Sequence, residues 1–433
     1  LARRCFYPAM GENGRTQLNI PRGYFSGEID AAIYPSRRLK QGPGPEEDLK
    51  QAATLLAQAQ RPVILSGGGV VMADALTATA ALADHLGAPV ANSYLHNDSF
   101  PLSHPLCLGP IGYCGSKAAM RVLARADLVL ALGCRLGPFG TLPQYDMEYW
   151  PTTAQVIQVD ADARVLGLAK RVDLAIAADA GEFARRVLEL LRASQPAPRP
   201  QEQIRAEVAQ ERAAWQAELD QWAARPSRRM HPRALLRELA AAIPPQAVVT
   251  TDVGNTCSMC NSYFGFDQGR RYLAPLSWGN CGIAYGLALG AQAGLPGLPV
   301  FALQGDGAYG ISGLSEVMTA VREELPVIAV VFNNNQWGAE KKNQIDYYAN
   351  RFVGTNLANP SYAKLAEDMG ALGLTVERPQ EVKEAVAAAL TAKRPVVIDA
   401  IIDGAAEVLA EPFRRDALKP PKRFLAKYQH LNA

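Results

Sequence analysis

The stretch "LQGDGAYG", residues 303–310, and the stretch "FNNNQWG", residues 332–338, decide the fold of this chain. Each begins at the end of an apolar run, and 25 residues lie between Gly307 and Asn333. That interval has room for one helix and one strand, which is the length of a single βαβ crossover. Because such crossovers return the second strand parallel to the first, we expect Asp306 and the asparagines at the same carboxyl edge of a sheet, where open α/β sheets bind ligands.

The polar residues at this edge predict a metal and phosphate site. A carboxylate, an amide oxygen and a main-chain carbonyl are hard oxygen ligands of the kind that Mg²⁺ takes. Gly305 and Gly307 let the backbone approach a ligand, and free N–H groups from Gly307 to Ile311 favour an anion. Two ordinary turns are the plain alternative, because Gly, Asp and Asn are common turn residues. Turns alone do not require this pairing across a crossover, so we favour the metal and phosphate site.

Composition limits the classes of protein to which the chain can belong. Its 433 residues are 48% apolar and 20% charged, which predicts two or three globular domains and excludes general disorder. The net charge of +2 gives no global field that would attract nucleic acid or a membrane surface. Without an apolar span or signal-peptide pattern, and with seven cysteines that read as reduced thiols, a cytoplasmic protein is expected. The C-x-x-C of Cys257 and Cys260 is a weak metal or redox signal.

Apolar runs alternate with helical patterns in two successive blocks, which predicts an α/β fold with two doubly wound parallel sheets. Two segments rich in Pro, at 34–48 and 192–203, are typical of linkers. "SGGGV" at 66–70 favours a tight βα turn over a dinucleotide loop, since it lacks the G-x-G-x-x-G spacing. Strands are expected at 61–68, 126–134, 155–162 and 173–179, and within "AVVTTDVGN", "LPVFALQGDG", "PVIAVVFNN" and "RPVVIDAII"; helices in the second block are expected at about 281–294, 311–324, 361–370 and 379–392.

The beginning of the sequence differs from both blocks. Residues 14–25, "GRTQLNIPRGYF", form a lone strand-like run. Because a single strand cannot make a sheet, we interpret it as the last strand of a domain whose earlier part lies outside this sequence. The predicted organisation is the end of that domain at 1–33, a linker at 34–47, a central Rossmann-like domain at 48–193, a linker and charged helix at 194–230, and a second α/β domain with a C-terminal tail at 231–433.

G-D-G followed after 25 residues by N-N resembles the signature of thiamine diphosphate (ThDP) enzymes. The resemblance implies that Asp306, Asn334 and the backbone carbonyl of Gln336 hold Mg²⁺. "TDVGNT" (251–256) resembles a second diphosphate contact, and "SWGNCGIAYG" (277–286) resembles the segment that grips the aminopyrimidine, with Cys281 in the place of a bulkier apolar residue. The implied cofactor-binding residues are Gly254, Asn255, Gly279, Asn280, Cys281, Gly305, Asp306, Gly307, Ala308, Asn334, Gln336 and Trp337.

By the same resemblance the two blocks correspond to the central and diphosphate-binding domains of that family, and 14–25 to the end of its pyrimidine-binding domain. In the family a glutamate of the pyrimidine-binding domain activates the cofactor, and no residue of this sequence takes that role. The resemblance therefore implies that the chain alone is a fragment that could be inactive. It also implies a homodimer or homotetramer, because ThDP sites form between subunits.

Residues 333–354 and 411–430 resemble the sulfoacetaldehyde acetyltransferases, a group within that family. The implied reaction converts sulfoacetaldehyde and phosphate to acetyl phosphate and sulfite, a step of taurine and sulfonate degradation. Glu340 lies where related decarboxylases carry an active-site acid, and both substrates are anions that need local cations. The catalytic candidates are Glu340, Lys341 and Lys342, and Arg414 and Arg415 are further candidate cations.

Two other functions stay open at this point. One is a ThDP-dependent lyase that acts on 2-oxo acids, such as an acetolactate synthase or a decarboxylase, for which pyruvate consumption with CO₂ release would be evidence. The other is a non-catalytic fragment that binds a diphosphate or nucleotide, for which binding without turnover would be evidence.

Overall fold

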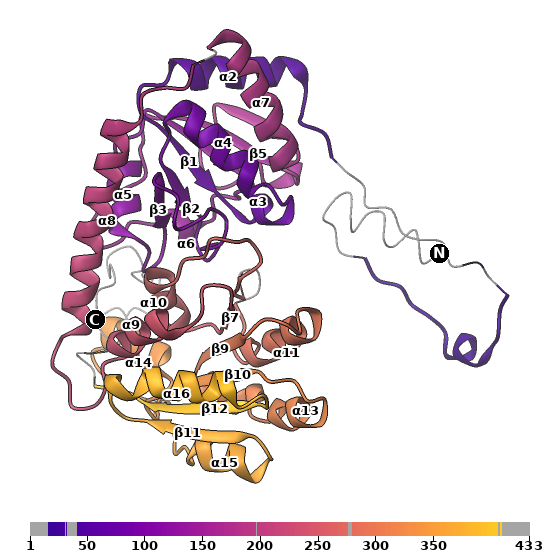
Figure 1. Cartoon of the computed structure of the whole chain (residues 1–433), viewed down its shortest axis with the longest axis vertical. Helices are drawn as coiled ribbons and strands as arrows, with labels where there is room; N and C mark the ends of the chain where they lie inside the picture. Colours follow the sequence, from indigo (N-terminus) through magenta and orange to yellow (C-terminus); the bar gives the residue numbers. More distant parts are fainter. Residues whose placement is uncertain are drawn as a thin grey trace, which may run out of the picture. The chain divides into compact units, whose positions relative to one another are not determined.

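The computed structural model describes residues 16–30, 32, 41–195, 197–275, 279–405 and 408. These residues form two six-stranded parallel sheets, in the strand orders β3-β2-β1-β4-β5-β6 and β11-β12-β10-β9-β7-β8 (Figure 1). Helices connect the strands of both sheets. The α/β class with two doubly wound parallel sheets is therefore confirmed.

The described residues divide into two compact units. The first comprises the described residues up to 89 together with 126–137 and 152–201, and the second comprises 90–125, 138–151 and those from 202 onward. The elements of the first unit are η1(Arg22–Ser26), α2(Glu46–Gln58), β1(Pro62–Ser66), α3(Gly68–Met72), α4(Leu76–Leu86), β4(Leu128–Leu132), β5(Gln155–Asp160), η2(Ala163–Val165), β6(Leu174–Ala177) and α7(Ala180–Ser194). The four strands expected here form, and Gly67 links β1 to α3 as the tight βα turn that "SGGGV" predicts.

The second unit holds the rest of the regular structure. Its elements are β2(Val90–Asn92), β3(Cys107–Pro110), α5(Lys117–Leu123), α6(Pro138–Thr141), α8(Glu202–Ala223), α9(Pro232–Ala242), β7(Val248–Thr251), α10(Asn255–Tyr263), β8(Tyr272–Leu273), α11(Ala284–Gly294), β9(Val300–Gly305), α12(Asp306–Ala308), η3(Tyr309–Gly313), α13(Glu316–Arg322), β10(Ile328–Asn333), α14(Gly338–Tyr347), α15(Tyr362–Asp368), β11(Leu372–Val376), α16(Pro379–Thr391) and β12(Val396–Ile401). The helices expected at 281–294, 311–324, 361–370 and 379–392 correspond to α11, α13, α15 and α16.

The crossover predicted from the opening stretches is present. β9 and β10 are parallel neighbours, and α12, η3 and α13 connect them. η3 is a turn of π-helix, closed by the hydrogen bond from Leu314 N to Tyr309 O at 2.9 Å. The turn inserts an extra residue between the sheet edge and α13.

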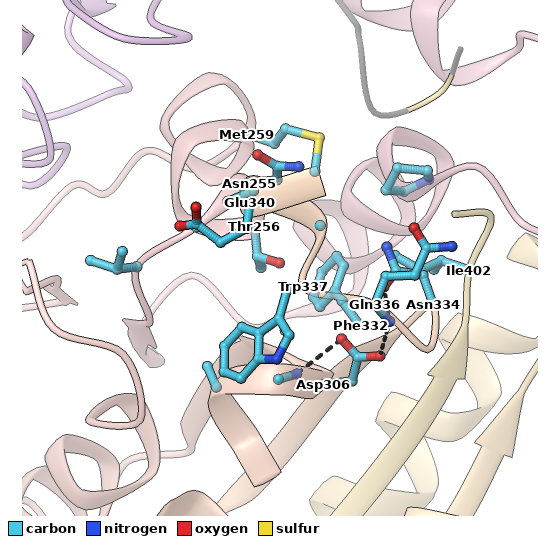
Figure 2. A pocket seen from close by; sticks show the side chains of 18 of the residues that line it. Asn255, Thr256, Met259, Asp306, Phe332, Asn334, Gln336, Trp337, Glu340 and Ile402 are labelled. Carbon is cyan, nitrogen blue, oxygen red and sulfur yellow. Dashed lines mark hydrogen bonds between the residues drawn. The ribbon is translucent and has the colours of Figure 1, made fainter. Parts of the chain in front are cut away.

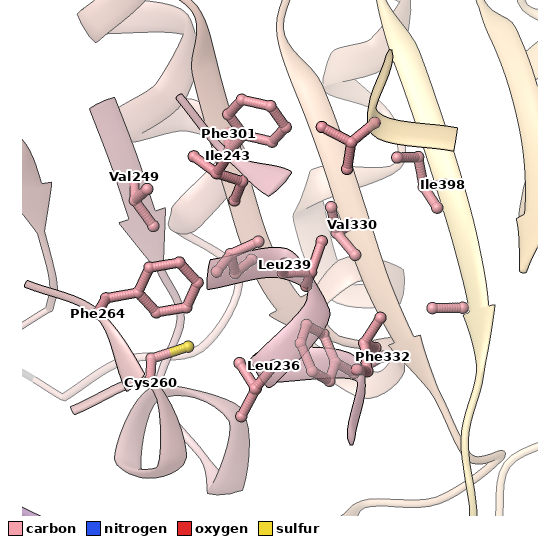
Figure 3. Close-up of a cluster of buried hydrophobic side chains, with 14 of the residues drawn as sticks. Leu236, Leu239, Ile243, Val249, Cys260, Phe264, Phe301, Val330, Phe332 and Ile398 are labelled. Carbon is pink, nitrogen blue, oxygen red and sulfur yellow. The ribbon is translucent and has the colours of Figure 1, made fainter. Parts of the chain in front are cut away.

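Successive residues of the central strands of this sheet pack alternately on its two faces, as the two-residue period of a strand requires. Val249, Phe301 and Val330 belong to a core completed by Leu236 of α9 and by α16 (Figure 3). Their neighbours in sequence, Val248, Ala302 and Val331 among them, belong to a second core with α11, α13 and α15. Because both faces are covered, only the strand ends are available to a ligand.

The strand expected at 14–25 is not formed in the described residues of that range. Residues 16–21 have no regular structure, and 22–26 form the 3-10 helix η1. The apolar side chains that suggested a strand are exposed, for example Tyr24 at 76% and Phe25 at 74%. Without a partner strand, the run has nothing with which to complete a ladder.

Two further features bear on the expectations from composition. Six cysteines in the described residues are free thiols, and Cys257 and Cys260 are buried in α10. Burial raises the pKa of Cys257 to about 12. Among the helices that the structure describes, none is long and apolar enough to cross a bilayer.

Candidate functional site

The carboxyl ends of β7, β9 and β10 open into one pocket. Phe332 on β10 is in register with Gly305 on β9, so Asp306 and Asn333 follow side by side at the sheet edge. The chain leaves the neighbouring strands β7 and β9 in opposite directions across the sheet, which is the arrangement of a ligand-binding switch point. Figure 2 shows Asp306, Asn334, Gln336 and Trp337 gathered at this edge.

Most of the predicted site residues line this pocket. Four of them lie outside the lining: Gly279 and Asn280, which are exposed, Lys341, which is partly buried, and Lys342, which is buried. Arg414 and Arg415 lie outside the described residues. The predicted residues that the structure brings together in the lining are Gly254, Asn255, Cys281, Gly305, Asp306, Gly307, Ala308, Asn334, Gln336, Trp337 and Glu340.

Asp306 is a buried carboxylate whose hydrogen-bond donors are neutral amides. It is 2% exposed. Its Oδ1 accepts from Gly307 N at 3.0 Å, and its Oδ2 accepts from Gln336 N at 3.2 Å and from Asn359 Nδ2 at 2.7 Å. Desolvation raises the pKa of Asp306 to about 6, although these donors oppose the rise. A carboxylate in this setting calls for a compensating cation.

The turn after β10 presents amide oxygens beside this carboxylate. Asn335 has a φ of 57°, a left-handed conformation that asparagine tolerates better than most residues. The turn brings Gln336 N within 3.1 Å of Asn334 Oδ1. The side-chain oxygen Oε1 of Gln336 is buried without a hydrogen-bond partner among the described residues. The turn therefore supplies several oxygen donors of the type that hard cations prefer.

Three helical segments begin at the pocket, and none has a side-chain cap. α10 begins after Gly254, whose φ of 123° is accessible to glycine. α12, which continues through η3 into α13, begins at Asp306, and α14 begins after Trp337. Uncapped first turns leave backbone N–H groups free, apart from that of Gly307, which donates to Asp306 Oδ1, and the helix dipoles add a positive potential. The pocket therefore favours an anion.

Asp252, between β7 and α10, ties the strand end to the segment that carries Cys281. It is fully buried and accepts hydrogen bonds from Gly282 N at 2.8 Å and Ala284 N at 3.1 Å. Desolvation raises the pKa of this carboxyl, and the backbone donors oppose the rise. Cys281 is partly buried beside the pocket, and desolvation raises the pKa of its thiol. Asp252 thus holds Cys281 close to the residues that follow β7.

Trp337 packs directly on the glycine of the G-D-G stretch. A Cβ built at Gly307 would lie 2.6 Å from the indole carbon Cε3 of Trp337, a distance that real side chains do not adopt. The backbone of Trp337 is held by the bond from its N to Thr355 O at 2.8 Å. Gly307 is required here because the indole occupies the space of a side chain.

The candidates on α14 lie in three different environments. Glu340 is exposed and lines the pocket (Figure 2). Lys341 Nζ lies 5.0 Å from the ring centroid of Phe352. Lys342 is 4% exposed and forms an ion pair with Asp346 one turn along the helix. Glu340 is therefore the one of the three that borders the pocket directly.

The residues present fit a divalent cation that carries a diphosphate. Asp306, Asn334 Oδ1 and the backbone carbonyl of Gln336 could supply a carboxylate, an amide and a peptide oxygen. The uncapped starts of α10 and α12 could bind the phosphate oxygens. The proposed metal ligands include one carboxylate, and they lie next to a site that favours an anion. This arrangement suits Mg²⁺, because that ion completes its coordination shell with phosphate oxygens and water.

Sequence reasoning missed three residues that shape the site. Asn359 lies in the segment before α15, and Tyr362 is the first residue of α15, where its Oη donates to Asp306 O at 3.2 Å. Asp252 is the third. Its position after a buried strand was a usable signal, of the same kind as that of Asp306. Asn359 lies in a non-periodic loop and carries no such signal.

Comparison with known proteins agrees with this geometry. A model of the central domain of thiamine pyrophosphate enzymes matches residues 49–187, and a model of their C-terminal TPP binding domain matches residues 252–400. The sulfoacetaldehyde acetyltransferase of Castellaniella defragrans is 48% identical over 98% of this chain and 74% of its own length.

Sequence identity is lower to an acetolactate synthase than to a second sulfoacetaldehyde acetyltransferase. The sulfoacetaldehyde acetyltransferase of Alcaligenes xylosoxydans xylosoxydans is 46% identical over the same shares of both chains. A probable acetolactate synthase large subunit of Methanocaldococcus jannaschii is 29% identical over 91% of this chain and 68% of its own. Two family models and two relatives above 40% identity thus agree with the α/β fold and its pocket at the strand ends, and the chain belongs to the thiamine pyrophosphate enzyme family.

Proposed function

We propose that the protein is a ThDP- and Mg²⁺-dependent acetyltransferase that converts sulfoacetaldehyde and phosphate to acetyl phosphate and sulfite. The observation that carries the proposal is the pocket at Asp306, in a chain 48% identical to a sulfoacetaldehyde acetyltransferase over almost its whole length. The acetolactate synthase relative supports the 2-oxo acid alternative less well, at 29% identity.

The metal would be held by Asp306, Asn334 and the backbone carbonyl of Gln336. Burial of Asp306 supports this role, because a bound cation would offset the cost of its desolvated charge. The diphosphate would lie against Gly254 and Asn255 at the start of α10, and against the 305–308 backbone. These groups bind and orient, since in such enzymes the cofactor performs the bond chemistry and the protein supplies position and electrostatics.

The organic part of the cofactor would lie between Cys281 and Trp337. When bound, ThDP supplies a nucleophilic carbon that attacks a carbonyl substrate. The partly buried Cys281 offers a small apolar contact there, and Trp337 offers a ring face backed by Gly307. Contacts of Gly279 and Asn280 with the aminopyrimidine stay predictions, because both lie outside the pocket lining.

Glu340 is the chain's candidate for proton transfer to or from a substrate in the pocket. It lies at the start of α14 and is solvent-accessible, so it can exchange protons with water. The charged residues of the described lining, Asp306, Glu340 and Asp403, are acidic. The cations that two anionic substrates need would therefore come from beyond that lining. Lys341 and Lys342 remain predictions for that role.

The deciding experiment follows sulfite and acetyl phosphate together. With sulfoacetaldehyde, phosphate, ThDP and Mg²⁺, we expect both products in equal amounts, and Asp306→Ala should abolish metal-dependent ThDP binding. CO₂ release from pyruvate without sulfite would instead establish a 2-oxo acid lyase. Binding of ThDP with no turnover of either substrate would reduce the function of this chain to cofactor binding.

A further inference from the structure

The 355–362 segment, which we call the strap, contacts both halves of the proposed metal site. Its backbone accepts from Trp337 N through Thr355 O and donates from Leu357 N to Asn335 O at 2.7 Å. Asn356 pairs with Gln336 in an antiparallel bridge. From the strap, the side chain of Asn359 reaches the Asp306 carboxylate.

Asn359 is oriented by a relay of hydrogen bonds that begins on β12. Asn333 Nδ2 donates to Asp399 Oδ1 at 2.9 Å, which turns Asn333 Oδ1 toward the strap. Asn359 Nδ2 donates to that oxygen at 3.1 Å and to Asp306 Oδ2 at 2.7 Å. Since both partners are acceptors, the amide must present its NH₂ group to them. The relay therefore fixes which end of the Asn359 amide faces the carboxylate.

A carboxylate offers about four lone-pair directions, two on each oxygen. On Oδ2 of Asp306 both are used, by Gln336 N and Asn359 Nδ2. On Oδ1 one is used, by Gly307 N at 3.0 Å. Oδ1 therefore carries one of these three hydrogen bonds and Oδ2 carries two, so Oδ1 is the oxygen with which Asp306 can bind a cation.

We propose that Asn359 is a positioning residue that restricts Asp306 to one-oxygen coordination and thereby makes the site select Mg²⁺ over Ca²⁺. The smaller ion demands a near-ideal octahedron, whereas Ca²⁺ accepts two oxygens of one carboxylate and variable coordination numbers. Without Asn359, Oδ2 regains a lone pair, and the carboxylate can bind a larger ion through both oxygens. The inference rests on the magnesium site proposed above and adds a determinant of its selectivity.

The test measures metal affinity rather than turnover. Calorimetry with the full chain and saturating ThDP would give dissociation constants for Mg²⁺ and Ca²⁺, for the unaltered protein, Asn359→Ala, and the near-isosteric Asn359→Leu. Outer-shell partners typically change metal affinity by about 10–100-fold. We expect both variants to weaken Mg²⁺ by about that factor and to leave Ca²⁺ within about threefold, so that the ratio of the two constants shifts at least about tenfold.

Asn356→Ala is the matched control, because Asn356 is exposed in the same strap and does not reach Asp306. It should leave the ratio unchanged. Equal weakening of both ions by Asn359→Ala or Asn359→Leu would mean that Asn359 only stabilises the fold, and an unchanged Mg²⁺ affinity would also overturn the inference. If the unaltered chain bound no Mg²⁺ in the presence of ThDP, both this inference and the proposed function would fail. If the Asn359 variants lost affinity for both ions equally, the inference would fail but the proposed function would not.

Discussion

The indole of Trp337 fills the space above Gly307, 2.6 Å from where a Cβ on that glycine would lie. The two residues come from the ends of neighbouring strands, β9 and β10. With the indole in this orientation, a residue larger than glycine does not fit at position 307.

Gly307→Ala should displace the indole and weaken ThDP binding by about tenfold or more, since a methyl group at that distance forces a side-chain or backbone shift. Calorimetric titration of ThDP with Mg²⁺ measures the effect. Trp337→Leu combined with Gly307→Ala should recover part of the loss. Gly286→Ala is the control, because a Cβ there has nothing within 4 Å; a loss as large in the control would remove the steric explanation.

Metal-free protein should lose stability as pH rises through the window between about 4 and 6. Burial raises the pKa of Asp306 from 3.8 to about 6, so in that window the folded chain holds a proton that the unfolded chain has released. The contribution of this group is present at low pH and lost above about 6, and amounts to about 3 kcal/mol at most. Asp306→Asn removes this component. Melting temperatures of the unaltered protein and of Asp306→Asn at pH 5 and pH 7 measure this contribution. If the melting temperatures of the two proteins changed equally with pH, the raised pKa of Asp306 would be contradicted.

The affinity of the protein for Mg²⁺ should also depend on pH near the pKa of Asp306. Because the ion binds the ionised carboxylate, its affinity should fall as the pH drops below about 6. Titrations at pH 5.5 and 7.5 test this expectation. An affinity that does not change with pH would mean that Asp306 does not bind the ion.

Asp252→Ala should release the backbone of Gly282 and Ala284, which lose their acceptors. Leaving buried N–H groups unpaired costs about 1–3 kcal/mol each. We expect a lower melting temperature together with weaker ThDP binding, because the contact of Cys281 with the pocket depends on that segment. Asp267→Ala, at a carboxylate that accepts from Ser103 N in an exposed contact, is the control for the loss of an acidic acceptor.

Glu340→Gln should slow sulfite release by about 10²-fold or more while leaving ThDP affinity within about twofold, since general acid–base groups contribute on the order of 10²–10⁴. Steady-state rates and cofactor titrations separate the two quantities. Glu316→Gln, at the start of α13 and outside the pocket lining, is the comparison. If the two variants behave alike, the effect does not belong to the Glu340 carboxylate.

Raised salt should lower the stability of the second unit slightly. Arg125, just after α5, pairs with Glu207 and Glu211 of α8 at 2.8 and 2.9 Å, and Arg121 on α5 pairs with Glu211 at 3.4 Å. Such partly exposed pairs contribute under about 1 kcal/mol each and are screened by salt. Glu211→Gln should reduce the salt dependence of the melting temperature, and Glu202→Gln, at the exposed start of α8, should not.

The positions of the principal strands along the chain and the meeting of Asp306 with Asn334 at one sheet edge could be predicted from the sequence, because apolar runs mark the strands and the crossover length brings their ends together. Asn359 could not, since its loop has no periodicity and its hydrogen bond spans 53 residues of sequence. β2 and β8 are only 3 and 2 residues long and carry too little pattern to detect. The predicted strand at 14–25 was wrong because apolar content alone does not supply a partner.

The π-helical turn at Tyr309–Gly313 also affects how related chains are compared. One extra residue rotates everything after it by about 100° about the helix axis, since an α-helix has 3.6 residues per turn. Residues before Tyr309 and after Leu314 therefore form two blocks with separate phases. An alignment or chimera that carries the helix across as one unbroken block would either misplace Asp306 or turn the apolar face of α13 toward water.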